Sequence, residues 1–302
     1  MKVTLDDCVE SFGTNINEFT DDFLDLFNKT PLEYDIPNQE DIILEVLKRL
    51  ENDNQIIGSK ERTEIWENGW RENLELFKQS KDMNDLTPKF IRPKQAIRFM
   101  GKYILSKVDN FELNYYSLFR LWFFQRYFLG YDYIYDFGCG SGFNLAMLAQ
   151  MYPNTQLVGL DFVPSSVELA REIGNILDIY IDSYMFDLIQ PNYSITIKKN
   201  SLVFTSGVIE QVASKFNEFL DYIIYNKPKL CIHIEPTIEM YENNLFDYLA
   251  IMFHKKRGYT VGYLPALQEL EKQGKAEIIK VKRLYFGSLM MEGFTYIIWR
   301  PL

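Results

Sequence analysis

The pattern of apolar and polar positions divides the chain at about residue 130. Before this point, apolar residues recur at helical spacing, which predicts helices over residues 42–50, 61–78, 98–107 and 115–128. Pro88 and Pro93 mark a loop between the second and third of them. We therefore expect residues 1–128 to form a mostly helical N-terminal domain that serves as a substrate or lid domain.

After residue 130, short apolar runs alternate with helical segments. The pattern predicts strands at residues 133–137, 156–162, 179–185, 201–206 and 230–236, and helices at 144–152, 164–177 and 215–225. This alternation is typical of a parallel sheet wrapped by helices. Two further helices are expected at 244–256 and 264–272, and two β-rich runs, 276–287 and 293–300, should pair antiparallel at the sheet edge. Residues 129–302 are thus predicted to form an α/β domain.

Composition narrows the class of protein. The 302 residues are 47% apolar and 25% charged, as in an ordinary soluble globular protein. The formal net charge of −10 disfavours nucleic acid as a partner. Cys8, Cys139 and Cys231 are too few and too widely spaced for a disulfide framework or a zinc site, which suggests reduced thiols in the cytoplasm. No signal-peptide core and no apolar run of about 18 residues is present, so we expect no membrane association.

A glycine-rich segment follows the first strand of the α/β half. Gly138, Gly140 and Gly142 allow a tight turn and a close approach of the backbone to a ligand. The helix expected straight after them would point its free N–H groups at that ligand. Asp161 lies 23 residues after Gly138, at the end of the next strand, where a carboxylate can accept hydrogen bonds from both ribose hydroxyls of a nucleoside.

The spacing of the glycines distinguishes between cofactors. A dinucleotide fingerprint would require a third glycine at position 143, which is Phe143 here. The pattern G-x-G-x-G instead resembles motif I of class I S-adenosylmethionine-dependent methyltransferases, and the resemblance covers roughly residues 130–302. It implies S-adenosyl-L-methionine as cofactor. It also implies a Rossmann-like, doubly wound, seven-stranded and mostly parallel sheet with an antiparallel last strand, behind the N-terminal helical domain.

The resemblance also implies a set of cofactor-binding residues. Asp136 should lie near the methionine moiety, Asp161 at the ribose and Asp187 at the adenine amino group. Residues before motif I often reach the methionine carboxylate in related enzymes, and Arg98 and Tyr103 are the candidates for that role. The remaining expected contacts come from the loop and from the strand ends: Gly138, Cys139, Gly140, Asn144, Phe162, Leu188 and Ser206.

Two carboxylates are candidate catalytic bases. Glu210 follows the fourth strand of the α/β half; it could act as base, bind substrate or cap a helix. Glu235 ends the fifth strand, two residues after His233. The two side chains could supply a general base or a metal pair, or else be a loop-capping carboxylate and a buried structural histidine. Many relatives carry a histidine where this chain has Gln211. A metal is not expected, because only His233 and His254 exist and no convincing carboxylate cluster accompanies them.

Two features of the N-terminal half could serve substrate binding. Six basic residues and no acidic one lie between Leu86 and Val108, which fits either recognition of an anion or a solvated helix face. Trp66 and Trp70 are four residues apart and share a helix face, so they could line an acceptor pocket or simply pack against a neighbour.

Together these observations predict methyl transfer to a small-molecule acceptor, which could be anionic. The acceptor atom is expected to be an oxygen of a sugar, a phosphorylated sugar or a specialised metabolite. The alternatives are a protein or RNA methyltransferase, or a non-catalytic partner that keeps the fold. The intact glycines and Asp161 argue against the last of these. The oligomeric state stays open, with a homodimer among the possibilities.

Overall fold

A seven-stranded sheet forms the centre of the protein, which a computed structural model describes over residues 1–58 and 60–302. The strand order is β6-β5-β4-β7-β8-β11-β9. Strands β4 to β8 pair parallel with one another, whereas β11 runs antiparallel to both β8 and β9. The predicted doubly wound, mostly parallel sheet is thus confirmed. Its strands are β4 (Tyr133–Phe137), β5 (Gln156–Asp161), β6 (Ile181–Met185), β7 (Ser201–Ser206), β8 (Leu230–Glu235), β9 (Ala276–Arg283) and β11 (Thr295–Pro301).

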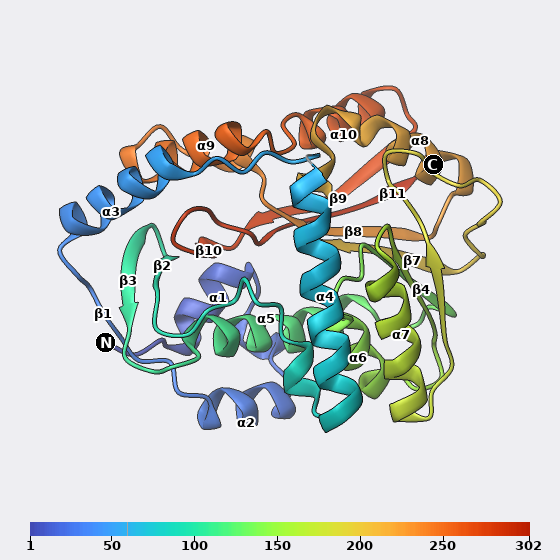
Figure 1. Ribbon diagram of the computed structural model, residues 1–302, viewed down its shortest axis with the longest axis horizontal. Helices are drawn as coiled ribbons and strands as arrows, with labels where there is room; N and C mark the ends of the chain where they lie inside the picture. The colour runs from blue at the N-terminus through green and yellow to red at the C-terminus, as the bar shows by residue number, and fades with distance from the viewer. Residues whose placement is uncertain (59) are drawn as a thin grey trace.

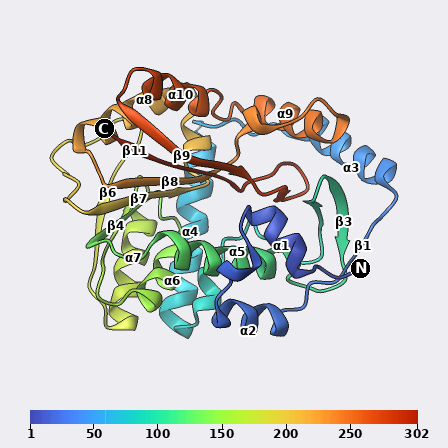
Figure 2. The same ribbon diagram turned by 180° about the vertical axis from the view of Figure 1, so that it is seen from behind.

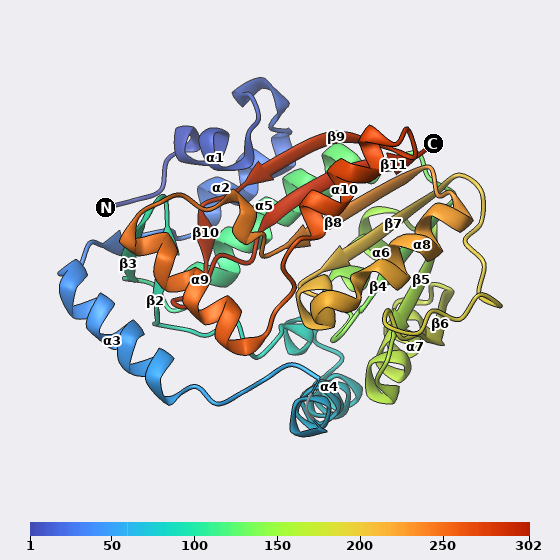
Figure 3. The same cartoon turned by 90° about the horizontal axis from the view of Figure 1, so that it is seen from above.

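Helices cover both faces of this sheet (Figure 3). Because side chains alternate along a strand, Ile134 of β4 joins one core and its neighbour Tyr135 the other. The first core takes buried side chains from α5 (Phe111–Tyr127), α6 (Phe143–Met151) and α7 (Pro164–Leu177). The second takes them from α8 (Phe216–Asn226) and α10 (Tyr263–Lys272). The carboxyl ends of the parallel strands are therefore left for loops and for the site.

The N-terminal half contributes helices and a small second sheet. Its helices are α1 (Leu5–Phe12), α2 (Asp21–Lys29), α3 (Gln39–Asn52) and α4 (Lys60–Ser80), with short 3-10 helices η1 (Ile16–Glu18) and η2 (Met83–Leu86). The helices predicted over 42–50, 61–78 and 115–128 are confirmed by α3, α4 and α5. Helix α9 (Leu245–Arg257) lies beside α3, although it comes from the other half of the chain (Figure 1). The short helices η3 (Ile209–Lys215) and η4 (Ile238–Met240) follow β7 and β8.

The helix predicted over residues 98–107 is wrong, because this segment forms a β-hairpin. Strands β2 (Ala96–Phe99) and β3 (Lys102–Ser106) pair antiparallel around a two-residue turn. Met100 and Gly101 both take positive φ there, 49° and 76°, which is the backbone that a tight hairpin needs. The hairpin is completed by β1 (Tyr34–Asp35) and β10 (Phe286–Gly287), in the order β1-β3-β2-β10. This sheet thus joins both sides of residue 128, and the division at that residue stays a prediction.

Aromatic side chains fix the first helices to the large sheet. Phe12 of α1 stacks on Trp122 of α5 with ring centroids 5.1 Å apart, and Phe123 lies 5.0 Å from Tyr296 of β11. Helix α5 is therefore buried between α1 and the sheet, as Figure 2 shows. Over residues 1–58 and 60–302, no helix combines the length and the apolar character needed to cross a membrane.

Candidate functional site

The glycine loop between β4 and α6 has a backbone conformation that favours glycine. Gly138, Gly140 and Gly142 have φ of 72°, 54° and 71°. A Cβ atom at Gly138 would lie 2.3 Å from Val208 Cγ2, and one at Gly142 would lie 2.2 Å from Ile173 Cδ1. Helix α6 begins directly after Gly142, so its free amides face the loop as the sequence predicts.

Asp161 at the end of β5 holds this loop in place. Its carboxylate accepts hydrogen bonds from the Gly140 amide at 2.9 Å and from the Val163 amide at 3.1 Å. Ser166 donates to the Gly140 carbonyl at 2.6 Å. Each carboxylate oxygen still has a second lone pair, so a ribose would share Asp161 with the loop. Burial raises the pKa of Asp161, and the amide hydrogen bonds oppose that rise.

Next to the loop lies a polar cluster, defined here as Tyr116, Arg120, Asp136, Asn144 and Ser206; the first three are buried and the last two half-buried. The guanidinium of Arg120 donates to the Phe143 carbonyl and lies 3.7 Å above the Phe143 ring. The hydroxyls of Tyr116 and Ser206 are 3.3 Å apart. Burial and the charge of Asp161 raise the pKa of Asp136 to about 8.

Three polar atoms of this cluster have no hydrogen-bond partner within residues 1–58 and 60–302: Asp136 Oδ2, Arg120 Nε and Asn144 Oδ1. A buried polar atom without a partner costs free energy, so such atoms point to a ligand. The carboxyl of Asp136 suits the ammonium of an amino acid, and the guanidinium of Arg120 suits its carboxylate. Sequence reasoning missed Arg120 and Tyr116; the available signal was the charge of Arg120 within the mostly apolar middle of this helix.

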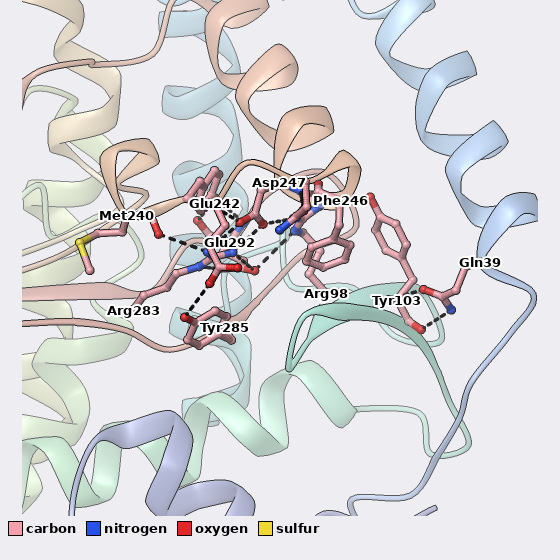
Figure 4. Close-up of polar contacts among 12 residues, drawn as sticks. Gln39, Arg98, Tyr103, Met240, Glu242, Phe246, Asp247, Arg283, Tyr285 and Glu292 are labelled. Atoms are coloured by element: carbon pink, nitrogen blue, oxygen red, sulfur yellow. Dashed lines mark hydrogen bonds and ion pairs between the residues drawn. The ribbon is translucent and has the colours of Figure 1, made fainter.

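The structure places Arg98 and Tyr103 elsewhere, in the small sheet beside α9. Arg98 Nη2 donates to Asp247 Oδ1 at 3.1 Å, and its Nη1 donates to the Tyr103 hydroxyl at 3.1 Å (Figure 4). Both side chains are almost fully buried among these partners. Because residues 98–107 form a hairpin rather than a helix, the structure does not bring Arg98 and Tyr103 to the glycine loop, where Arg120 lies instead.

Three of the predicted cofactor contacts, Phe162, Asp187 and Leu188, follow the ends of the neighbouring strands β5 and β6, and Asp187 is the one predicted at the adenine. Phe162 is 43% exposed, so its ring is available for stacking. Asp187 accepts a hydrogen bond from the Ile189 amide at 2.8 Å and is exposed, while Leu188 is buried. Cys139 is buried beside Ser166, and burial raises its thiol pKa, so it is not a reactive thiolate.

Glu235 braces the loop after β7. Its carboxylate accepts from the Thr205 hydroxyl at 2.7 Å and from the Val208 amide at 3.0 Å. His233 Nε2 accepts from Trp299 at 2.8 Å, so the ring proton sits on Nδ1 and donates to Thr205 at 2.9 Å. Burial lowers the pKa of His233 to about 3, which keeps it neutral. This geometry matches the structural alternative for both residues.

Glu210 differs from Glu235 because one of its oxygens is free. Oε1 accepts from Gln211 Nε2 at 2.7 Å, whereas Oε2 has no partner among the described residues. The side chain is 8% exposed, and burial together with the charge of Glu235 raises the pKa of Glu210 to about 8. A buried carboxyl in this state suits proton exchange with a ligand.

Helix α4 lies across the carboxyl edge of the sheet, where Figure 3 shows it almost end-on. A Cβ at Gly140 would lie 3.1 Å from Trp70 Cζ2, so this tryptophan packs on the loop. Trp66 stacks on Trp70 with centroids 5.3 Å apart. Glu67 accepts from the amide and hydroxyl of Ser165 at the start of α7. Helix α4 therefore forms a wall of the site.

A surface cavity of about 390 Å³ lies at the opposite edge of the sheet, where β4 and β5 begin. Asp132, Asn154 and Asp178 are among its lining residues, and none of the predicted site residues line it. Within the described part of the chain, no group of three or more His, Cys, Asp or Glu side chains could hold a metal ion. The polar cluster and Glu210 therefore remain the candidate groups for ligand binding and proton transfer.

Residues 134–215 match a family model described as a methyltransferase domain, a segment that runs from β4 through the glycine loop to the end of η3. A search of curated proteins found no match. Among solved structures, the chain is similar to the pyocyanin biosynthetic protein PhzM (13% identity, 63% of this chain, 56% of that chain, TM-score 0.47). It is also similar to the riboflavin-derivative dimethyltransferase RosA from Streptomyces davawensis (12% identity, 64% of this chain, 56% of that chain, TM-score 0.44). A third similar structure is PigF with SAH (15% identity, 87% of this chain, 70% of that chain, TM-score 0.48). The chain thus spans 56% of the length of PhzM and of RosA.

Proposed function

Because the chain contains a class I S-adenosylmethionine-dependent methyltransferase domain, we propose that it transfers a methyl group to an oxygen of a small-molecule acceptor. The observation that carries this proposal is the polar cluster beside the glycine loop. Asp136 Oδ2 and Arg120 Nε have no hydrogen-bond partner among the described residues, and their side chains match the two opposite charges of the amino-acid end of S-adenosylmethionine. Three buried free cysteines support the further proposal that the protein works in the cytoplasm.

Each residue of the site has a defined task in this proposal. Bound S-adenosylmethionine supplies a methyl group that its sulfonium already activates. Arg120 holds the carboxylate of the cofactor, Asp136 its ammonium and Asp161 its ribose, which fixes the direction of the methyl group. Helix α4 excludes water from that edge of the sheet. Alignment then provides most of the rate enhancement.

Glu210 is the base in this proposal. Its free Oε2 accepts the proton of the acceptor hydroxyl while the oxygen–methyl bond forms and the sulfur–methyl bond breaks, so the sulfonium becomes a neutral thioether. Glu235 keeps the loop that carries Glu210 in place through its hydrogen bonds to Thr205 and to the Val208 amide. A sugar, a phosphorylated sugar or a specialised metabolite is the acceptor class that we propose.

Calorimetry with S-adenosylmethionine and S-adenosylhomocysteine tests the cofactor part. We expect both to bind, and Asp161→Ala to weaken binding by about 1.5–3 kcal/mol, the usual range for a hydrogen bond to a charged group. Asp161→Asn separates the ribose contact from the bracing of Gly140, because it keeps one oxygen for the amide. Asp182→Ala, in the middle of β6, is the control and should bind normally. No binding of either compound by the wild type would contradict the proposal.

A further inference from the structure

Thr260, three residues after the end of α9, makes three contacts with the loop that carries Glu210. Its amide donates to the Glu210 carbonyl at 3.0 Å. Its hydroxyl lies 2.5 Å from the Ile209 carbonyl oxygen and 2.8 Å from the Ala213 carbonyl oxygen, so its single proton is shared between them. Thr260 is buried, and little water reaches these contacts. One residue therefore ties the beginning and the middle of η3 to the segment after α9.

The turn at Ala213 has a backbone conformation that suits glycine. Its φ of 52° and ψ of −130° are close to those of the first central residue of a type II′ turn, a position that glycine dominates. An alanine keeps such a conformation only where the surrounding contacts impose it. Because the Ala213 carbonyl is one of the two that the Thr260 hydroxyl holds, Thr260 is placed to impose this turn.

Thr260 is itself anchored on the α9 side. Nε2 of His254, which lies in α9, donates to the Thr260 carbonyl at 2.6 Å, since a carbonyl oxygen only accepts. His254 is fully buried, and burial lowers its pKa, which favours the neutral ring. Loss of the Thr260 hydroxyl would therefore release η3 and leave the segment after α9 in place.

The Glu210 carboxyl depends on this loop for its position. Oε1 accepts from Gln211, a residue of the same loop, and Oε2 has no partner among the described residues. The titratable and charged groups that act on this carboxyl come from other segments: Glu235, Arg62, Arg257 and Tyr259. A displacement of η3 therefore changes the surroundings of the carboxyl on every side.

We propose that Thr260 is a positioning residue, which holds the turn at Ala213 and thereby keeps the Glu210 carboxyl where it can accept a proton from the acceptor. Glu235 braces the loop before Glu210 through the Val208 amide, and Thr260 holds the turn after it, so the base lies between two supports. This inference rests on the proposed methyl transfer, because it assigns a residue that positions the base of that reaction.

The test follows the Glu210 carboxyl directly and needs no acceptor. Carbon-13 NMR of protein labelled at the glutamate carboxyl groups gives its titration, and the Glu210 signal is the one missing from Glu210→Gln. In the wild type we expect a midpoint near pH 8, because burial and the charge of Glu235 raise the pKa of Glu210 to about 8.

Thr260→Val keeps the shape of the side chain and removes its hydroxyl. As the turn relaxes and water reaches the Glu210 carboxyl, its midpoint should fall by about one pH unit or more. Thr260→Ser keeps the hydroxyl and should keep the wild-type midpoint. Adding Ala213→Gly to Thr260→Val should restore most of the shift, because glycine adopts this turn without strain.

Thr155→Val is the matched control, since it removes a hydroxyl that donates to the Tyr131 carbonyl at the opposite edge of the sheet. It should leave the Glu210 midpoint unchanged. A purely structural Thr260 would affect only the unfolding midpoint in urea, which is measured on the same variants. Should Thr260→Val not fold, Thr260→Ala carries the same expectation.

The proposal is overturned if the Glu210 signal titrates in Thr260→Val as in the wild type, or if Thr260→Ser shifts it as far as Thr260→Val does. A wild-type midpoint near the ordinary pKa of glutamate, or no restoration by Ala213→Gly, would also overturn it. Calorimetry with S-adenosylhomocysteine on the same samples reports on the proposed function separately. Failure of the wild type to bind it would contradict methyl transfer and leave the titration result standing.

Discussion

Two buried glutamates of the site have opposite surroundings. Thr205 and the Val208 amide donate to Glu235, which leaves it little freedom, whereas the Gln211 side chain is the donor to Glu210. Burial raises the pKa of both, to about 7 for Glu235 and about 8 for Glu210. Groups with such different environments take different roles, so we assign proton transfer to Glu210 and bracing to Glu235.

Replacing Glu210 by glutamine should lower kcat by about 10²- to 10⁴-fold, the usual contribution of a general base. Because burial and Glu235 raise the pKa of Glu210 to about 8, the wild-type carboxyl is mostly protonated at pH 7, with Arg62 and Arg257 opposing the rise. Its kcat/KM should therefore increase with pH and level off above about pH 8. The variant should lose this dependence and still bind S-adenosylhomocysteine normally; an unchanged pH profile would exclude Glu210 as the base.

Asp136 gives a second pH effect, on cofactor binding. In the free protein burial and Asp161 raise its pKa to about 8, while Arg120 acts in the opposite direction. The cofactor ammonium stabilises the carboxylate, so binding below pH 8 should release a proton and affinity should rise from pH 6 to pH 8. Calorimetry in two buffers with different ionisation enthalpies measures that proton. Asp136→Asn should abolish the release, and a release that persists would assign the proton to another group.

At the scale of elements, the sequence correctly predicted those helices and strands that the local spacing of apolar residues determines. The strands of the large sheet and helices α3, α4 and α5 follow directly from apolar periodicity. The hairpin β2–β3 was not predicted from this periodicity, because its short strands are stabilised by β1 and β10, which are distant in sequence. Its turn also places Met100, a residue without turn preference, at φ 49°. Tertiary pairing there overrides a spacing that suits a helix equally well.

The glycine loop permits a prediction that separates backbone strain from steric clash. Gly138→Ala places a Cβ 2.3 Å from Val208 at φ 72°, whereas Gly207→Ala has a similar φ of 67° and nothing within 4 Å. Gly207→Ala should cost about 1–2 kcal/mol of unfolding free energy from strain, and Gly138→Ala about 1–3 kcal/mol more from overpacking. Urea denaturation measures both. Equal losses would mean that Val208 moves aside freely.

At the scale of the whole molecule, only part of the candidate site could be predicted from the sequence. The glycine loop and Asp161 are close in sequence to the strands that place them, so their positions were predictable. Arg120 and Tyr116 reach the site because α5 packs between α1 and the sheet, and no local pattern encodes that contact. Arg98 was predicted to bind the methionine carboxylate because it lies in a basic segment before the glycine loop, but in the hairpin its side chain contacts Asp247 instead.

The ion-pair network of Arg98, Asp247, Arg283 and Glu292 connects the small sheet with the rest of the molecule, and the last prediction concerns its contribution to stability. Arg283 Nη2 lies 2.6 Å and Arg98 Nη2 3.1 Å from Asp247 Oδ1, while Arg283 Nε lies 2.6 Å from Glu292, all at 3% exposure or less (Figure 4). Removing the Asp247 carboxylate leaves the two buried cations with only Glu292 in this network, so Asp247→Asn should lower the free energy of unfolding by about 3–5 kcal/mol.

The exposed pair of Arg300 and Glu277 is the matched control, and Glu277→Gln should cost at most about 1 kcal/mol. One apolar core contains Phe12 and Phe99 from the first half of the chain together with Tyr296 of the large sheet. Urea unfolding of Asp247→Asn, followed by fluorescence and by circular dichroism, should therefore remain a single transition at lower denaturant concentration. Two separate transitions would mean that the network, rather than this shared core, unites the two parts of the molecule.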